Sequence, residues 1–92
     1  MTITLSKFGV VLTSRQAGRE AFAAFQPTLA SLKPDEKIEV DFAGLSTLSP
    51  SWADEFLTPL CKLYGGRVLL LPTENPSVKF TMEILKLPDN SN

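Results

Sequence analysis

Apolar and polar residues follow a period of two in three parts of the chain. Residues 2–6 alternate, and Gly9 introduces a short apolar run over 10–12, which together predict a β-hairpin. Alternation returns over 37–42 and predicts a strand. The run RVLLL at 67–71 does not alternate, which is typical of a strand covered on both faces and predicts the central strand of a parallel sheet.

A helical period of about 3.6 residues appears first over residues 14–32. Thr13 and Gln16 predict a capping box at its start. Pro27 predicts a kink or a restart, with the ring facing solvent, because proline removes a backbone hydrogen bond and clashes with the preceding turn. Small residues at the start of the apolar side favour close packing of the first turns against a sheet. The apolar side comprises Ala17, Gly18, Ala21, Phe22, Phe25, Leu29 and Leu32.

Two further helices begin with a capping residue followed by proline. Ser49 and Pro50 start a helix over 50–64, which Gly65 and Gly66 end. Asn75 and Pro76 repeat the signal, and that helix runs to about residue 86. On the helix over 50–64 the expected buried half is Trp52, Ala53, Phe56, Leu57, Leu60, Cys61, Leu63 and Tyr64, and the polar half is Asp54, Glu55, Thr58 and Lys62.

The expected element order is ββαβαβα, which predicts an α/β fold with right-handed crossovers. We expect a mixed sheet that has a parallel core and an N-terminal β-hairpin, with helices packed on the sheet. Residues 1–88 form a single domain in this prediction, and the polar residues 89–92 form a flexible C-terminal tail.

Composition removes several classes of function. The net charge of −1 gives no field to attract nucleic acid or an acidic membrane, and no apolar run approaches the ~20 residues of a membrane span. The chain has no histidine, which excludes a Ser-His-Asp triad and a Cys/His zinc site. Its one cysteine, Cys61, forms no internal disulfide and is expected in the core. We therefore expect a cytoplasmic protein that is not an enzyme and holds no metal or cofactor.

The segments IEVDFAGL at 38–45 and SWADEF at 51–56 carry a resemblance. A strand ending in Asp-Phe, a glycine, and a helix beginning Ser-aromatic-Ala-Asp-Glu resemble the STAS-like family of unknown function, over roughly residues 8–87. The same region is more distantly similar to STAS domains of bacterial anti-sigma-factor antagonists.

The resemblance implies a regulatory domain that works by protein–protein contact. In the antagonists the partner is a serine kinase of the GHKL ATPase type, which phosphorylates a serine at the helix N-terminus. Aligned on Asp41 and Gly44, that phosphoacceptor position holds Pro50, so Ser49 or Ser51 would take the role only after a one-residue shift. The implied partners are such a kinase or another sigma-factor regulator, and a homodimer is an alternative.

The candidate interaction or switch residues each have a structural alternative. Ser49 is expected chiefly as a helix cap, whereas Ser51 lies in the first turn, where backbone N–H groups favour a phosphate. Trp52 is either a core residue or a partly exposed interface anchor. Asp54 and Glu55 form a solvated helix face or a surface for partner recognition, and their 100° separation on the helix argues against a general acid/base pair.

An alternative function is binding of a small ligand or nucleotide. Open α/β sheets bind ligands at the carboxyl ends of their strands. Asp41, Ser46 and Thr47 follow the strand over 37–42 and are the candidate pocket residues, with Ser51 nearby in this interpretation. For Asp41 the structural alternative is a carboxylate that caps the following loop.

Overall fold

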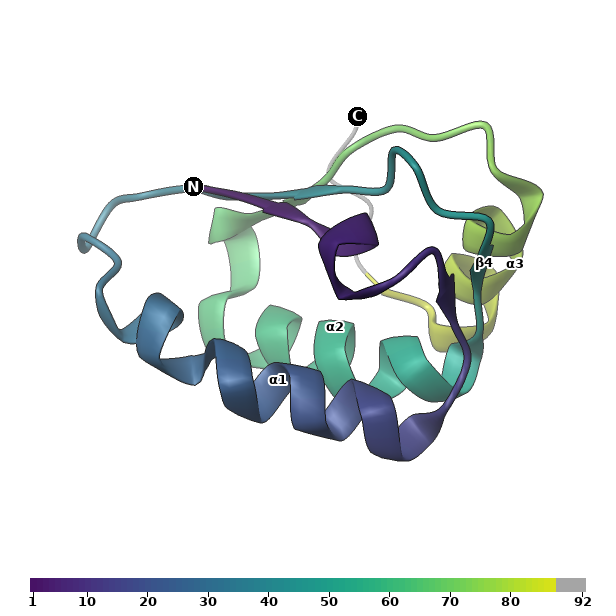
Figure 1. Ribbon diagram of the computed structural model, residues 1–92. Helices are drawn as coiled ribbons and strands as arrows, with labels where there is room; N and C mark the ends of the chain where they lie inside the picture. Colours follow the sequence, from purple (N-terminus) through teal and green to yellow (C-terminus); the bar gives the residue numbers. More distant parts are fainter. Residues whose placement is uncertain (88–92) are drawn as a thin grey trace.

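The computed structural model describes residues 1–87, which form an α/β fold with three helices packed on small parallel sheets (Figure 1). The helices are α1 (Arg15–Ala30), α2 (Pro50–Tyr64) and α3 (Pro76–Leu85). Each begins within about one residue of its predicted start. None of the helices in this part of the chain is long and apolar enough to cross a membrane.

The strands form two separate sheets. In the larger sheet, β3 (Ile38–Asp41) lies between β1 (Thr2–Thr4) and β5 (Val68–Leu70), and both pairings are parallel. The smaller sheet pairs β2 (Val11–Leu12) with β4 (Thr47–Leu48), again in parallel. Two 3-10 turns, η1 (Leu5–Phe8) and η2 (Gly65–Arg67), complete the described elements.

The predicted N-terminal hairpin and mixed sheet are wrong. The strands β1 and β2 belong to different sheets because η1 turns the chain between them and buries the Leu5 side chain in the core. Gly9 follows η1 at φ 143°, a backbone conformation open to glycine. The predicted flexible tail over 89–92 lies outside the described residues.

The larger sheet is covered by helices on one face, with α1 and α2 on the same side (Figure 1). Ile3, Val40 and Leu70 lie in register across the three strands and are buried. On the opposite face, Thr2 and Glu39 are exposed. The prediction that residues 67–71 form a central strand covered on both faces is wrong, because β5 is an edge strand and its Leu69 is only partly buried.

The start of α1 differs in detail from the predicted capping box. Ser14, rather than Thr13, caps the helix, and its side-chain oxygen accepts a hydrogen bond from the Ala17 N–H at 3.1 Å. Pro27 is exposed, as predicted, but α1 continues through it to Ala30 without a restart. Neighbouring turns therefore hold the helix despite the missing backbone donor.

The helices α1 and α2 approach each other closely at Gly18 of α1. An ideal Cβ placed on Gly18 would lie 2.5 Å from the Trp52 carbonyl oxygen of α2. The small residues of α1 were expected to meet a sheet, whereas Gly18 meets the backbone of another helix. Rings from α1, α2 and η1 fill the space beside this contact: Phe8, Phe22, Phe25, Trp52 and Phe56.

We predict that Gly18→Ala destabilises the fold by about 1–3 kcal/mol, because the added methyl group meets a backbone carbonyl that cannot rotate away. Without the clash the same change would stabilise a helix interior by about 0.5–1 kcal/mol. The control is Gly66→Ala, since no described heavy atom lies within 4 Å of a Cβ there. Urea unfolding measures both; a Gly18→Ala variant at least as stable as wild type contradicts the close contact.

Candidate functional site

Ser49 ties the start of α2 to the segment after β2. Its Oγ accepts a hydrogen bond from the Trp52 N–H at 3.2 Å and donates one to the Thr13 carbonyl oxygen at 2.8 Å. The predicted capping role of Ser49 is confirmed. The Ser49 hydroxyl therefore uses both its donor and its acceptor capacity within the fold. Its modification would release both the start of α2 and the segment after β2.

Ser51 and Trp52 lie side by side in the first turn of α2 and differ in exposure. Ser51 is half-buried, and its hydroxyl makes no hydrogen bond to another residue in the range 1–87. Trp52 is 1% exposed, and its ring stacks on Phe56 with centroids 5.1 Å apart. Trp52 is therefore a core residue and not a partly exposed interface anchor.

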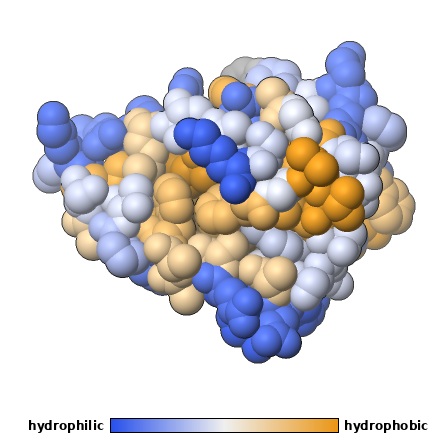
Figure 2. Space-filling model, in the orientation of Figure 1, coloured by the Kyte–Doolittle hydropathy of each residue, from blue (hydrophilic) through white to orange (hydrophobic). Residues whose placement is uncertain are grey.

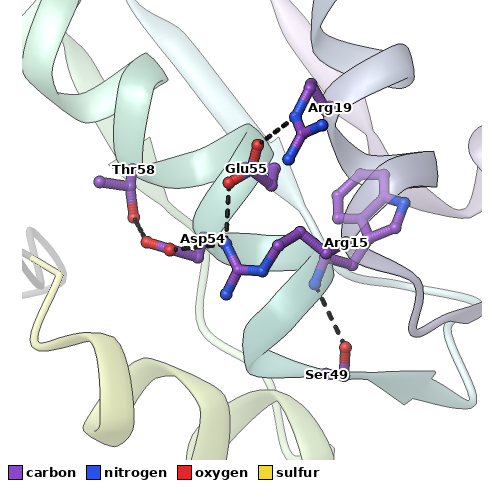
Figure 3. Close-up of polar contacts among 7 residues, drawn as sticks. Arg15, Arg19, Ser49, Asp54, Glu55 and Thr58 are labelled. Carbon is purple, nitrogen blue, oxygen red and sulfur yellow. Dashed lines mark hydrogen bonds and ion pairs between the residues drawn. The ribbon is translucent and has the colours of Figure 1, made fainter.

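Asp54 and Glu55 are held by two arginines of α1 (Figure 3). Arg15 Nη1 lies 3.1 Å from Asp54 Oδ2 and 2.8 Å from Glu55 Oε2. Arg19 Nε donates to Glu55 Oε1 at 2.9 Å, and the Thr58 hydroxyl donates to Asp54 Oδ1 at 2.9 Å. The two carboxylates therefore join α2 to α1 instead of forming an unpaired solvated face.

These contacts shift the acid–base equilibria of the cluster. Hydrogen bonding from Arg15, then from Thr58, lowers the pKa of Asp54. Hydrogen bonding from Arg19 is the main cause of the lowered pKa of Glu55. Hydrogen bonding to Asp54, then to Glu55, raises the pKa of Arg15. Both acids remain charged at neutral pH, which suits an ion pair and not a general acid.

The candidate pocket residues do not form a common pocket. Asp41 Oδ1 accepts a hydrogen bond from the Ala43 N–H at 3.0 Å, so it caps the loop after β3. Ser46 is exposed and Thr47 belongs to β4. A groove of about 370 Å³ does lie near the carboxyl ends of β3 and β5, but none of these three side chains lines it. Its lining is Phe42, Leu70, Leu71, Pro72, Thr73, Val78, Lys79, Met82, Glu83 and Leu87.

Helix α3 closes one side of the smaller sheet. Ser77 Oγ accepts a hydrogen bond from the Leu48 N–H at 3.0 Å and donates one to the Leu48 carbonyl oxygen at 3.1 Å. The buried Thr81 hydroxyl donates to the same oxygen. The N–H and carbonyl oxygen of Leu48 are therefore already hydrogen-bonded to side chains, and another strand could not pair with them.

A second open groove, also of about 370 Å³, lies beside β2. Phe8, Val10 and Val11 are exposed at 36%, 55% and 57%, and we call these three residues the β2 face. Figure 2 shows apolar side chains gathered on the side of the molecule where η1, β2 and α1 lie. The groove is lined by Phe8, Val11, Leu12, Thr13, Ser14, Ala17, Glu20, Ala21 and Trp52.

Sequence reasoning missed the β2 face and the two arginines. The polar side of the helix over 14–32 carries Arg15 and Arg19 one turn apart, a spacing that could have indicated a partner for an acidic pair. Val10 and Val11 of the β2 face were instead assigned to a hairpin. The exposure of the β2 face depends on how β2 pairs, which the sequence pattern did not reveal.

The described residues contain no group of three Cys, Asp or Glu side chains arranged to hold a metal ion. Cys61 is buried, and burial raises the pKa of its thiol, which disfavours the reactive thiolate. Comparison of the chain with protein-family models, curated protein sequences and solved structures gives no match.

We predict that Ser49→Ala lowers the free energy of unfolding by about 1–2 kcal/mol, because the Trp52 N–H and the Thr13 carbonyl oxygen both lose their partner. Ser51→Ala is the matched control and should lie within about 0.5 kcal/mol of wild type. Thermal or urea unfolding measures both. Equal losses in the two variants would contradict the assignment of the cap to Ser49.

Acidification should weaken the contact between α1 and α2. The folded-state pKa values of Asp54 and Glu55 lie below their ordinary values of 3.8 and 4.5. Their ion pairs therefore stabilise the fold above those values, and the contribution is lost as the pH falls through the folded pKa values.

Arg15→Gln should consequently flatten the pH dependence of stability on the acid side. Lys7→Gln is the control, since Lys7 forms no ion pair with another residue of the range 1–87. Urea unfolding from neutral to acidic pH measures the difference. Identical slopes for the two variants would show that the Arg15 pairs do not form in solution.

Proposed function

We propose that this protein is a non-catalytic regulatory domain that binds another protein through the β2 face and the adjoining start of α2. The observation that carries the proposal is the exposure of Phe8, Val10 and Val11 beside an open groove that Phe8 and Val11 line. Apolar side chains grouped in this way are typical of a protein interaction site. The resemblance of residues 38–45 and 51–56 to STAS-like domains supports the same class of function.

The proposal moves the partner's contact away from Asp54 and Glu55. These carboxylates already pair with Arg15 and Arg19, and a partner that bound them would first have to displace those pairs. We include the loop over 43–51 in the contact because it supplies β4, which pairs with β2. Ser46 in this loop is exposed.

A serine phosphoswitch at Ser51 belongs to this proposal. The Ser51 hydroxyl serves no hydrogen bond within the described chain, unlike that of Ser49, so phosphorylation would not break the helix cap. The first turn of α2 supplies the positive end of the helix dipole and the N–H of Ser51, since Pro50 has no N–H and the Trp52 N–H is bound to Ser49. The partner in this proposal is a GHKL-type ATPase with serine kinase activity or another sigma-factor regulator.

We predict that Val11→Glu abolishes capture of the partner from the native source, because a charge on the β2 face would lose its hydration on binding. Leu63→Glu is the matched control, since Leu63 is 62% exposed on α2 and does not line the groove. Affinity capture with quantitative mass spectrometry compares both with wild type. A partner lost equally from both variants, or from neither, would contradict the proposal.

A further inference from the structure

The groove of about 370 Å³ at the carboxyl ends of β3 and β5 has no part in the proposed protein contact. Phe42 follows β3 directly, Leu70 is the last residue of β5, and both line the groove together with α3. In open α/β sheets, ligands bind outside the carboxyl ends of the strands. The volume of this groove also lies within the range of small-molecule sites.

The floor of the groove is apolar. Phe42, Leu70 and Val78 line it, and each is less than a tenth exposed. Met82 lines it one helical turn after Val78 and is partly buried against the core. These side chains suit an aromatic ring or a short aliphatic chain, because the apolar surface of such a ligand would leave water on binding.

Two charged side chains of α3, Lys79 and Glu83, also line the groove. They are neighbours on the helix but do not pair with each other, because Lys79 Nζ lies 2.9 Å from Glu74 Oε2. The Glu83 carboxylate forms no hydrogen bond or ion pair with another residue of the range 1–87. Lys86, three residues further along, does not line the groove. Glu83 is therefore the charge that the groove offers to a ligand.

This arrangement favours a cation over an anion. A carboxylate ligand would have to displace Glu74 from Lys79, whereas an ammonium group would meet a carboxylate without a partner among the described residues. The chain itself offers no cation from its last residues. The segment over 88–92, which follows the groove-lining Leu87, contains Asp89 and no Lys or Arg.

We propose that this groove binds a small organic amine, with the apolar part of the ligand over Phe42, Leu70 and Met82 and its ammonium group against the Glu83 carboxylate. This binding site goes beyond the proposed function, because none of Phe8, Val10 and Val11 lines the groove. The apolar floor supplies affinity, and Glu83 selects the charge of the ligand.

The test compares phenethylamine, phenethyl alcohol and hydrocinnamate, which share a phenyl ring and differ in charge. Each is titrated into the intact, isotope-labelled protein while backbone amide NMR shifts are recorded. We expect phenethylamine to shift the amides of α3 and of residues 70–73. It should bind about threefold tighter than the alcohol, and the carboxylate should bind most weakly. Absence of shifts in these segments, or equal affinities for the three probes, would overturn the inference.

Glu83→Gln should lower the affinity for phenethylamine to that for phenethyl alcohol, because the charge is lost and the shape is kept. Glu20→Gln is the matched control, since Glu20 is an exposed helix carboxylate that does not line this groove. It should bind phenethylamine as wild type does. A thermal melt establishes that both variants fold. Equal affinities of the two variants for phenethylamine would contradict the role of Glu83.

Glu74→Gln tests the charge balance of the groove. It leaves Lys79 without its ion-pair partner, so hydrocinnamate should bind tighter and phenethylamine more weakly than to wild type. Unchanged affinities for both probes would show that charge does not select the ligand and would overturn the assignment of an amine.

Ethylamine tests the apolar floor, because it carries the ammonium group without the ring. It should bind about tenfold or more weakly than phenethylamine, since burial of the ring is lost. Equal affinities for the two amines would reduce the site to a surface charge and overturn the inference. Shifts of α3 amides that depend on protein concentration without a probe would identify a second copy of the chain as the occupant, which would overturn it as well.

Discussion

The close contact between Gly18 and the Trp52 carbonyl oxygen is the constraint on which the rest of the structure depends. It sets the separation of α1 and α2, and that separation decides what fits between them. Phe22 packs edge-on against Phe56 at 5.6 Å, and Arg15 and Arg19 reach the carboxylates of α2. A larger residue at position 18 would move the aromatic packing and the ion pairs together. The aromatic packing and the ion pairs between α1 and α2 therefore both depend on this one close contact between their backbones.

The helices could be predicted from the sequence and the sheet pairing could not. A cap and a proline mark the starts of α2 and α3 locally, so the signal lies in adjacent residues. Strand pairing is set by distant residues: Thr2 aligns with Glu39, and Val11 with Thr47. The hairpin prediction assumed that neighbouring strands pair, and nothing local revealed that η1 would bury Leu5 and divert the chain.

Some features of the candidate site could likewise be predicted from the sequence, and others could not. Ser49 was identified because helix capping is local, whereas the arginine partners of Asp54 and Glu55 come from another helix. From its position at the edge of the apolar side of the helix, Trp52 could be either a core residue or an interface anchor. Its packing against Phe8 and Phe56 shows that it is a core residue. Asp41 was assigned to a pocket because strand ends attract ligands in this fold class, but its carboxylate is occupied by the Ala43 N–H.

The parallel pairing of every described strand has a consequence for the order of folding. Each ladder joins residues separated by a helix or more of chain, so a ladder forms only after a long loop has closed. Local contacts within α1 and α2 carry a smaller entropic cost and precede the sheets. The helical turns of α1 and α2 should therefore form first, and strand residues such as Val40 should acquire their native contacts late. Sequence changes in the strands would then alter the unfolding rate more than the folding rate.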